Sequence, residues 1–370
     1  MSTKPEITIN KLPNYSDKHH TADGHFENEP GEPSPPPQPE MMNSVSKFMS
    51  ALWKAIREKP DVTEPMPIRK LEKGSKEFEI NPKDKSIKVW WLGHATLLLR
   101  INNKYIITDP MLSSYASPIP GFFKRVTPPP ITEEDLPPIS YIIYSHDHYD
   151  HLSYDTLTKL KKINPNVTIF GPLGLDRLVN GWNSNFNVIP FDWRTNTTVD
   201  GITFTCFPSH HFSRRTMTDA ATKLWCSWLF QYTTDNNDTI SIYFGGDTAL
   251  GPHFQEVRNF VGRPIDLALM PVGPQNPESV MRTVHLNPQD VKDMSDVLEA
   301  KVVVPIHYGT FPLGHEIETP DLELIRRLWT SDTLLPLKTG GRAEMQINSD
   351  GSHSEKFVVQ NEEEMLQPNN

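Results

Sequence analysis

The sequence predicts a layered α/β fold. From residue 80 onward, β-rich segments alternate with segments of helical periodicity, and mixing on this scale is typical of helices packed on sheets. The chain has 370 residues, of which 36% are hydrophobic, so it can bury a large core. We therefore expect one large domain with extensions, or at most two domains.

The strand candidates are short runs rich in β-branched and aromatic residues, separated by turn-forming residues. They span residues 87–92, 95–101, 105–108, 141–144, 167–170, 187–190, 202–207, 224–232, 239–244, 265–270 and 301–305. Helix candidates lie near 153–163, 173–180, 252–261, 288–299 and 320–330. The helix at 288 has a clear start, because Asn287 can cap it and Pro288 occupies the first helical position, where a missing N–H costs nothing.

The two ends of the chain differ in composition from the predicted domain, residues 80–346. Residues 1–42 are polar and proline-rich, which predicts a flexible arm. Residues 43–60 predict an amphipathic helix, with one apolar stripe from Val45 to Ile56 surrounded by lysine and arginine. This helix could lie in a membrane interface or pack on the domain. Residues 347–370 are polar and acidic and predict a frayed tail.

Composition narrows the classes of function. The net charge of −10 argues against a nucleic-acid-binding protein, because neutralising phosphates needs a basic face. Only two cysteines occur, Cys206 and Cys226, and they suit packing as reduced thiols rather than a disulfide framework. There is neither an apolar run long enough to span a bilayer nor a secretory signal at Met1. We expect an intracellular protein, soluble or peripheral to membranes.

A dense group of metal ligands follows the strand candidate at 141–144. Residues 146–151 read His-Asp-His-Tyr-Asp-His, and imidazole and carboxylate are the ligands that suit zinc. A loop leaving a strand end can turn successive ligands toward one point, so we interpret it as a metal site. A solvated histidine-rich loop is the alternative.

More candidate ligands follow other predicted strands. His211 comes after 202–207, Asp247 after 239–244 and His307 after 301–305. Gly245 and Gly246 allow the backbone before Asp247 to approach closely, and a carboxylate there could bridge two cations roughly 3.5–4 Å apart. A single His or Asp at a strand end is usually a cap or a surface group. Recurrence at three strand ends favours a two-metal site.

This order of ligands resembles the metallo-β-lactamase superfamily over roughly residues 85–345. The resemblance implies an αββα sandwich with a binuclear metal site, expected to hold two Zn²⁺, at one edge of the two sheets. It also implies the ligands: His146, His148 and His211 for one metal, Asp150, His151 and His307 for the other, and Asp247 between them.

Short sequence motifs around these ligands give a narrower resemblance, to the family of N-acyl-phosphatidylethanolamine-hydrolysing phospholipases D. They are WLGHAT at 91–96, TDP at 108–110, SHDHYDHL at 145–152, PSHH at 208–211, GDT at 246–248 and IHYGTF at 306–311, with further similarity at 23–28 and 216–228. Two departures occur. His210 stands where the family usually has a glutamine, which raises a ligand assignment shifted by one residue, but the register of the motif keeps His211 as the ligand; 274–280 lacks the aromatic residues expected there.

The resemblance implies hydrolysis of N-acyl-phosphatidylethanolamine to phosphatidic acid and an N-acylethanolamine. Two divalent cations that share a water lower its pKa enough to supply a bridging hydroxide, which would attack phosphorus in line. Asp150, Asp247 and His285 are the expected catalytic residues; His285 would meet the phosphate or protonate the leaving alkoxide. The family implies peripheral association with the cytoplasmic face of membranes, and it suggests a homodimer.

Other residues have supporting roles with alternatives. Asp109 would orient a ligating histidine by accepting its second ring N–H, or would cap the turn before Pro110. Arg215, Phe122 and Phe123 could contact the lipid phosphate or the interface.

The rival functions are a soluble, lactonase-like metal-dependent hydrolase acting on small molecules and a non-catalytic lipid-binding scaffold. An RNA-processing nuclease is disfavoured by the acidic balance of the chain.

Overall fold

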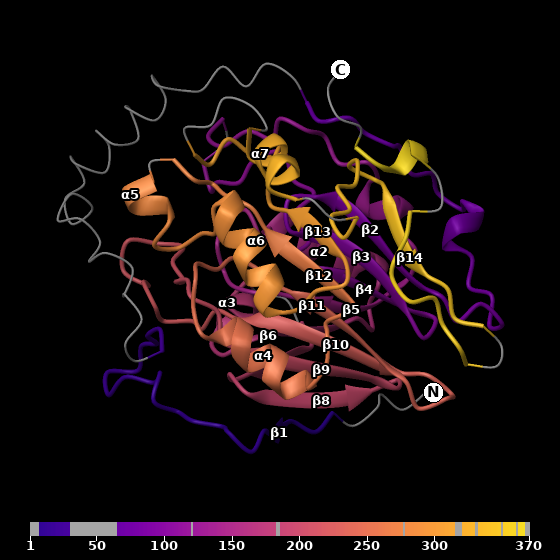
Figure 1. Ribbon diagram of the computed structural model, residues 1–370. Coiled ribbons are helices and arrows are strands. Elements are labelled where there is room, and N and C mark those ends of the chain that lie inside the picture. Colours follow the sequence, from indigo (N-terminus) through magenta and orange to yellow (C-terminus); the bar gives the residue numbers. More distant parts are fainter. Residues whose placement is uncertain are drawn as a thin grey trace.

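Two seven-stranded sheets face each other in the computed structural model of this chain (Figure 1). The structure describes residues 7–29, 65–119, 121–182, 186–276, 278–314, 320–329, 332–348, 351–359 and 362–366. The layered α/β fold predicted from the sequence is confirmed.

The first sheet has the strand order β1-β8-β9-β10-β11-β12-β13. Its strands are Asn10–Lys11, Thr195–Val199, Ile202–Phe207, Ser227–Thr233, Thr239–Phe244, Leu267–Pro271 and Val303–Ile306. Strand β10 is antiparallel to both β9 and β11, while β11, β12 and β13 are parallel. As a result β9, β11, β12 and β13 all run in one direction.

The second sheet has the order β14-β2-β3-β4-β5-β6-β7. Its strands are Arg342–Met345, Ile87–Gly93, Thr96–Ile101, Lys104–Thr108, Ile139–Ile143, Thr168–Pro172 and Val188–Phe191. Strands β14, β2, β3 and β4 pair in antiparallel fashion, and β4 to β7 are parallel. Strands β4 and β5 therefore end at the same edge of their sheet.

Both faces of the second sheet are buried, which explains its nearly continuous apolar strands. In β2, Ile87, Val89 and Trp91 belong to the core between the sheets, whereas Trp90 and Leu92 belong to a second core under the helices. This alternation follows from the two-residue period of a strand.

Helices cover the outer faces. Helix α2, Tyr154–Ile163, and α3, Leu175–Asn180, supply Leu157, Leu160 and Val179 to the outer core of the second sheet. Over the first sheet lie α4 (His253–Val261), α6 (Pro288–Val297) and α7 (Pro320–Leu328), with the short α5 (Glu278–Met281) before α6 (Figure 1). Asn287 caps α6 in a reciprocal capping box with Asp290, as the sequence indicates.

The predicted elements match the observed ones closely, with three strands and one helix missed. Strand β8 is Thr-Asn-Thr-Thr-Val, a hydroxyl-rich sequence that resembles a turn more than a strand. Strand β1 has two residues, α5 has four, and β14 pairs with β2 from a distant part of the chain. Tertiary pairing rather than local pattern forms the three strands.

The expected flexibility of both termini does not hold for the residues that the structure describes. Residues 7–29 pack on the domain, and β1 pairs with β8. In the tail, Phe357 and Leu366 are buried, and Val358 bridges to Glu344. The predicted helix at 43–60 lies outside the described residues.

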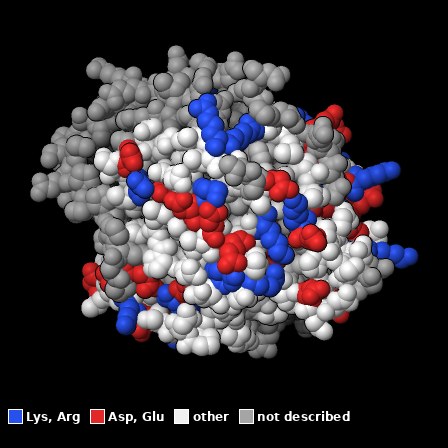
Figure 2. All heavy atoms as spheres, in the orientation of Figure 1, with Lys and Arg blue, Asp and Glu red and all other residues white. Residues whose placement is uncertain are grey.

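Charges of both signs are interspersed on the visible face of the domain (Figure 2). Cys206 and Cys226 are buried free thiols, as expected from the sequence. Within the described part of the chain, every helix is too short or too polar to cross a bilayer.

Candidate metal centre

The loops that follow five strands meet at one edge of the sandwich. Strands β4 and β5 of one sheet and β9, β11 and β13 of the other each deliver their carboxyl end to this edge. The loops after them carry Asp109, residues 146–151, His211, Asp247 and His307 in that order. The topology thus brings together ligands that are up to 161 residues apart in the sequence (307 − 146).

Four side chains form the first ligand cluster: His146, His148, His211 and Asp247. His148 Nδ1 lies 2.8 Å from His146 Nε2 and 3.2 Å from His211 Nε2. Three nitrogens around one tetrahedral zinc would stand about 3.3 Å apart, given Zn–N distances of 2.0–2.1 Å. The ring nitrogens therefore converge at spacings that suit a single cation.

The second cluster contains Asp150, His151 and His307. Asp150 Oδ2 lies 3.5 Å from His151 Nε2 and 3.7 Å from His307 Nε2. The two histidine Nε2 atoms are 3.3 Å apart. These distances again fit one small cation held by nitrogen and oxygen.

Asp247 stands between the two clusters. Its Oδ2 lies 3.9 Å from His146 Nε2, 3.7 Å from His211 Nε2 and 3.2 Å from His151 Nε2. Its Oδ1 lies 3.0 Å from His307 Nε2. The carboxylate therefore faces ring nitrogens of both clusters, which is the arrangement of a bridging ligand.

Gly246 allows this carboxylate to reach the loop of residues 146–151. A Cβ atom on Gly246 would lie 2.5 Å from Ser145 Cβ, and its backbone has a φ of +59°. Both facts require glycine at this position. The close approach expected from the sequence is therefore present at Gly246.

Four of the five ligating rings, those of His146, His151, His211 and His307, have a hydrogen-bond partner at the nitrogen that faces away from the cluster. His151 Nδ1 bonds to Asp109 Oδ2 at 2.8 Å, and Ser145 Oγ, which donates to the same carboxylate, lies 2.9 Å from His146 Nδ1. His211 Nδ1 donates to the Val284 carbonyl at 2.9 Å and His307 Nδ1 to the Gly273 carbonyl at 3.0 Å. Such partners fix the tautomer and aim the free nitrogen at a metal.

The protonation states of His148, His211 and Asp247 also favour the binding of a metal. Burial and the neighbouring histidines lower the pKa of His148 to about 3, and burial holds the pKa of His211 at about 4. Burial opposes ionisation of Asp247, yet His151 and His307 hold the pKa of its carboxyl well below the ordinary value. Neutral His148 and His211 beside an ionised Asp247 are the forms that bind a cation. For His151 and His307, burial is outweighed by Asp247 and Asp150, which raise the pKa of both rings, so these two rings must lose a proton when a cation binds. The donor set therefore fits a divalent metal of the zinc type.

His94 joins the site although the sequence did not mark it as a site residue. Its Nε2 lies 3.0 Å from Asp150 Oδ2, its ring packs 4.0 Å from that of His307, and its own carbonyl accepts the His307 N–H. Burial lowers the pKa of His94 to about 3, so the neutral ring donates to Asp150 and orients it. In the sequence, His94 is marked only by its place in the motif Gly-His-Ala-Thr, between two predicted strands.

Arg215 lies behind the metal-binding loop. Its Nη1 donates to the carbonyls of Asp147 and Leu152 at 2.5 and 2.9 Å, and its guanidinium stacks on the Tyr149 ring at 3.9 Å. These contacts brace the loop from both ends. Arg215 and Tyr149 also line a cavity of about 750 Å³ beside the loop.

The other predicted residues take different positions. His285 lies beside the centre, with its buried Nδ1 3.9 Å from Asp247 Oδ2 and without a hydrogen-bond partner there. The ring of His210 lines a separate cavity with Leu250 and Arg282, so His211 keeps the ligand position. Phe122 and the exposed Phe123 belong to the loop after β4, outside the residues that line the cavity near Arg215.

Comparison with known proteins agrees with this geometry. Residues 104–308 match the β-lactamase superfamily domain. An N-acyl-phosphatidylethanolamine-hydrolyzing phospholipase D 1 of Caenorhabditis elegans is 32% identical over 239 residues, which are 60% of this chain and 64% of the relative. The resemblance noted in the sequence is confirmed, but the chain spans less than two thirds of the length of the first curated relatives that it matches.

More distant relatives are similar over most of their length. A metal-dependent hydrolase of Saccharolobus solfataricus is 29% identical over 60% of this chain and 85% of its own. Among solved structures, the isothiocyanate hydrolase from Delia radicum gut bacteria has a TM-score of 0.55 at 20% identity, covering 69% of this chain and 97% of that one. This last likeness shows the fold alone.

Proposed function

The chain belongs to the β-lactamase superfamily, and we propose that it is a zinc-dependent phosphodiesterase of the phospholipase D type. In this proposal it hydrolyses N-acyl-phosphatidylethanolamine to phosphatidic acid and an N-acylethanolamine. One observation carries the proposal: two ligand clusters share the Asp247 carboxylate, in a chain 32% identical to a protein named for this reaction.

The site residues have two kinds of role in this proposal, holding the metals and orienting the ligands. His146, His148 and His211 would hold one Zn²⁺ and Asp150, His151 and His307 the other, with Asp247 between them. Two such cations, when bound, supply a water of lowered pKa and neutralise charge on the phosphoryl oxygens. His94 and Asp109 keep Asp150 and His151 aimed inward, so little reorganisation is needed during the reaction.

The bond changes balance without a protein nucleophile. The oxygen of water forms a bond to phosphorus, and the bond from phosphorus to the ethanolamine-side oxygen breaks. The attacking water loses a proton and the leaving oxygen gains one. His285 lies beside the ligands with no hydrogen-bond partner at Nδ1, and burial holds its pKa well below the ordinary value, so this nitrogen could take the proton of the water and pass it to the leaving oxygen.

Peripheral membrane association is part of the same proposal. Large apolar side chains are exposed on the loops and helix starts that follow strands at the ligand edge of the sandwich, where they could enter a lipid interface. They are Ile119 and Phe123 after β4, Tyr154 after β5, Met217 after β9, Leu250 after β11 and Val280 after β12. The cytoplasmic face and a homodimer remain predictions from the resemblance.

A soluble hydrolase acting on small molecules is the second candidate. It is favoured by the relative from Saccharolobus solfataricus, which this chain covers over 85% of its length and which is named only as a metal-dependent hydrolase. The two candidates differ in the substrate that reaches the same metal centre.

The first prediction concerns the products formed in ¹⁸O-water. Zinc-loaded protein incubated with N-acyl-phosphatidylethanolamine in mixed micelles should form ¹⁸O-labelled phosphatidic acid and unlabelled N-acylethanolamine, because water attacks phosphorus; mass spectrometry measures both. An Asp247→Asn variant should lose most of this turnover. Intact lipid with full metal occupancy, together with hydrolysis of water-soluble esters, would reject the phospholipase and favour the soluble hydrolase.

The second prediction concerns His285. A His285→Gln variant should lose turnover of N-acyl-phosphatidylethanolamine by about 10²-fold or more, the usual contribution of general acid catalysis. Hydrolysis of a 4-nitrophenyl phosphodiester should fall far less, because 4-nitrophenolate leaves without a proton. Equal losses on the two substrates, at unchanged metal content, would assign His285 to binding and contradict protonation of the leaving group.

The third prediction concerns the exposed apolar loops. The double variant Ile119→Ser, Met217→Ser should pellet with anionic phospholipid vesicles in a smaller fraction than the unmodified protein. Ile163→Ser is the matched control, since Ile163 is equally exposed but lies at the far end of α2, away from the ligand edge. If all three proteins sediment alike, the ligand edge is not the membrane-facing side.

A further inference from the structure

The N-terminal residues 7–29, here called the N-terminal strap, wrap the edge of the first sheet (Figure 1). Asn10 and Lys11 pair with Asn196 and Thr195, and the Leu12 N–H donates to the Arg194 carbonyl at 2.8 Å. The strap is therefore attached by backbone hydrogen bonds at its start. Its other end lies at the metal centre.

Asn28, at that end, holds the backbone of the ligand His211. Its Nδ2 donates to the His211 carbonyl at 3.1 Å, and its Oδ1 accepts the His211 N–H at 3.3 Å. The same Oδ1 accepts the indole N–H of Trp225 at 3.0 Å. Asn28 is only 6% exposed, so these bonds form without competition from solvent.

His211 has a particular need for such a partner. It lies between β9 and β10, in residues 208–226, which contain no helix or strand among the residues that the structure describes. No ladder of hydrogen bonds therefore fixes its backbone. The Val284 carbonyl sets the rotation of the ring through Nδ1, and of the residues that the structure describes it is Asn28 that bonds both backbone groups of His211.

Anchors on both sides hold Asn28 in place. Before it, the Phe26 N–H donates to the Ala221 carbonyl at 2.9 Å, and the buried His19 bonds Asp192 at 2.7 Å while its ring stacks on Trp193. After it, Glu29 pairs with Arg194 at 2.7 Å.

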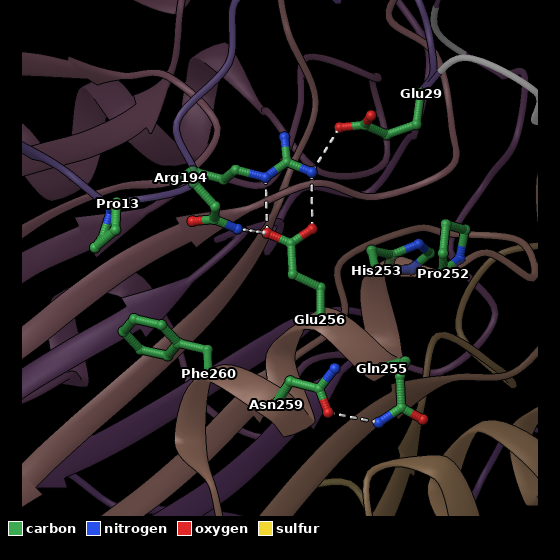
Figure 3. Close-up of a pocket in the computed structure, with 10 residues that line it drawn as sticks. Pro13, Glu29, Arg194, Pro252, His253, Gln255, Glu256, Asn259 and Phe260 are labelled. Atoms are coloured by element: carbon green, nitrogen blue, oxygen red, sulfur yellow. Dashed lines mark hydrogen bonds and ion pairs between the residues drawn. The ribbon is translucent and has the colours of Figure 1, made fainter.

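Arg194 in turn forms two bonds of 2.7 Å with Glu256 of α4 (Figure 3). The amide of Asn28 is thus placed by the folded domain rather than by a loose chain.

We propose that Asn28 is a positioning residue for the metal ligand His211, which makes the N-terminal strap part of the metal centre. The inference rests on the metal-binding part of the proposed function and is independent of the substrate. A plain alternative is that Asn28 only satisfies buried polar groups. That role would lower stability on mutation but would leave the metal affinity of the folded protein unchanged.

The test measures metal binding by the full-length chain. Asn28→Ala should bind one of two Zn²⁺ ions about tenfold or more weakly in competition with a chelator, the range found when a group that orients a ligand is lost. The Co²⁺-substituted variant should also change its visible absorption, which reports coordination geometry. The second, tighter Zn²⁺ should be retained, because His151 and His307 have their own partners.

Asn14→Ala is the matched control, since Asn14 lies in the same strap but its amide donates to Glu256 at 2.8 Å. It should bind both Zn²⁺ ions as the unmodified chain does. Asn28→Asp, which keeps the shape and the acceptor oxygen but loses the donor to His211, decides the question if Asn28→Ala does not fold. Unchanged zinc affinity and unchanged Co²⁺ absorption in the folded Asn28 variant would overturn the proposal, whatever happens to lipid hydrolysis.

Discussion

The shared carboxylate of Asp247 is the feature on which the rest of the centre depends. A charged group buried between two clusters of imidazoles is costly unless opposite charge or a cation compensates it. Here the compensation comes from both sheets at once, because His151 lies in the loop after β5 of the second sheet and His307 directly after β13 of the first. The two sheets must therefore meet in one relative position, and Gly246 permits the contact that fixes it.

Orientation is achieved mainly by neutral partners outside the ligand set. Two ligating rings donate to backbone carbonyls, of Val284 and Gly273, which lie in irregular segments following β12. Asp109 serves His151, and the neutral His94 serves Asp150. Residues in the loops of the ligand edge thus orient the side chains of the metal ligands. The N-terminal strap contributes in the same way, because Asn28 holds the backbone of His211.

Most of the fold could be predicted from the sequence, and the seven residues proposed as ligands could be named from it, because each lies in a segment that follows an apolar strand ending at the same edge of the sandwich. His94 and Asn28 could not, since their roles arise from contacts 56 and 183 residues away in the chain. Local pattern also favoured a flexible arm at 1–42, but within its described part, residues 7–29, polar residues such as His19 and Glu29 bond to the domain. Arg215, expected at a lipid surface, braces the loop, because two carbonyls face it from behind.

We propose that two cations share the Asp247 carboxylate at the edge where the loops of both sheets come together. Anomalous X-ray diffraction from crystals of the zinc-loaded protein, collected at the zinc absorption edge, tests it most directly. We expect two peaks roughly 3.5–4 Å apart, one among His146, His148 and His211, the other among Asp150, His151 and His307, with the Asp247 carboxylate between them. A single peak, or two peaks of which only one touches Asp247, would contradict it.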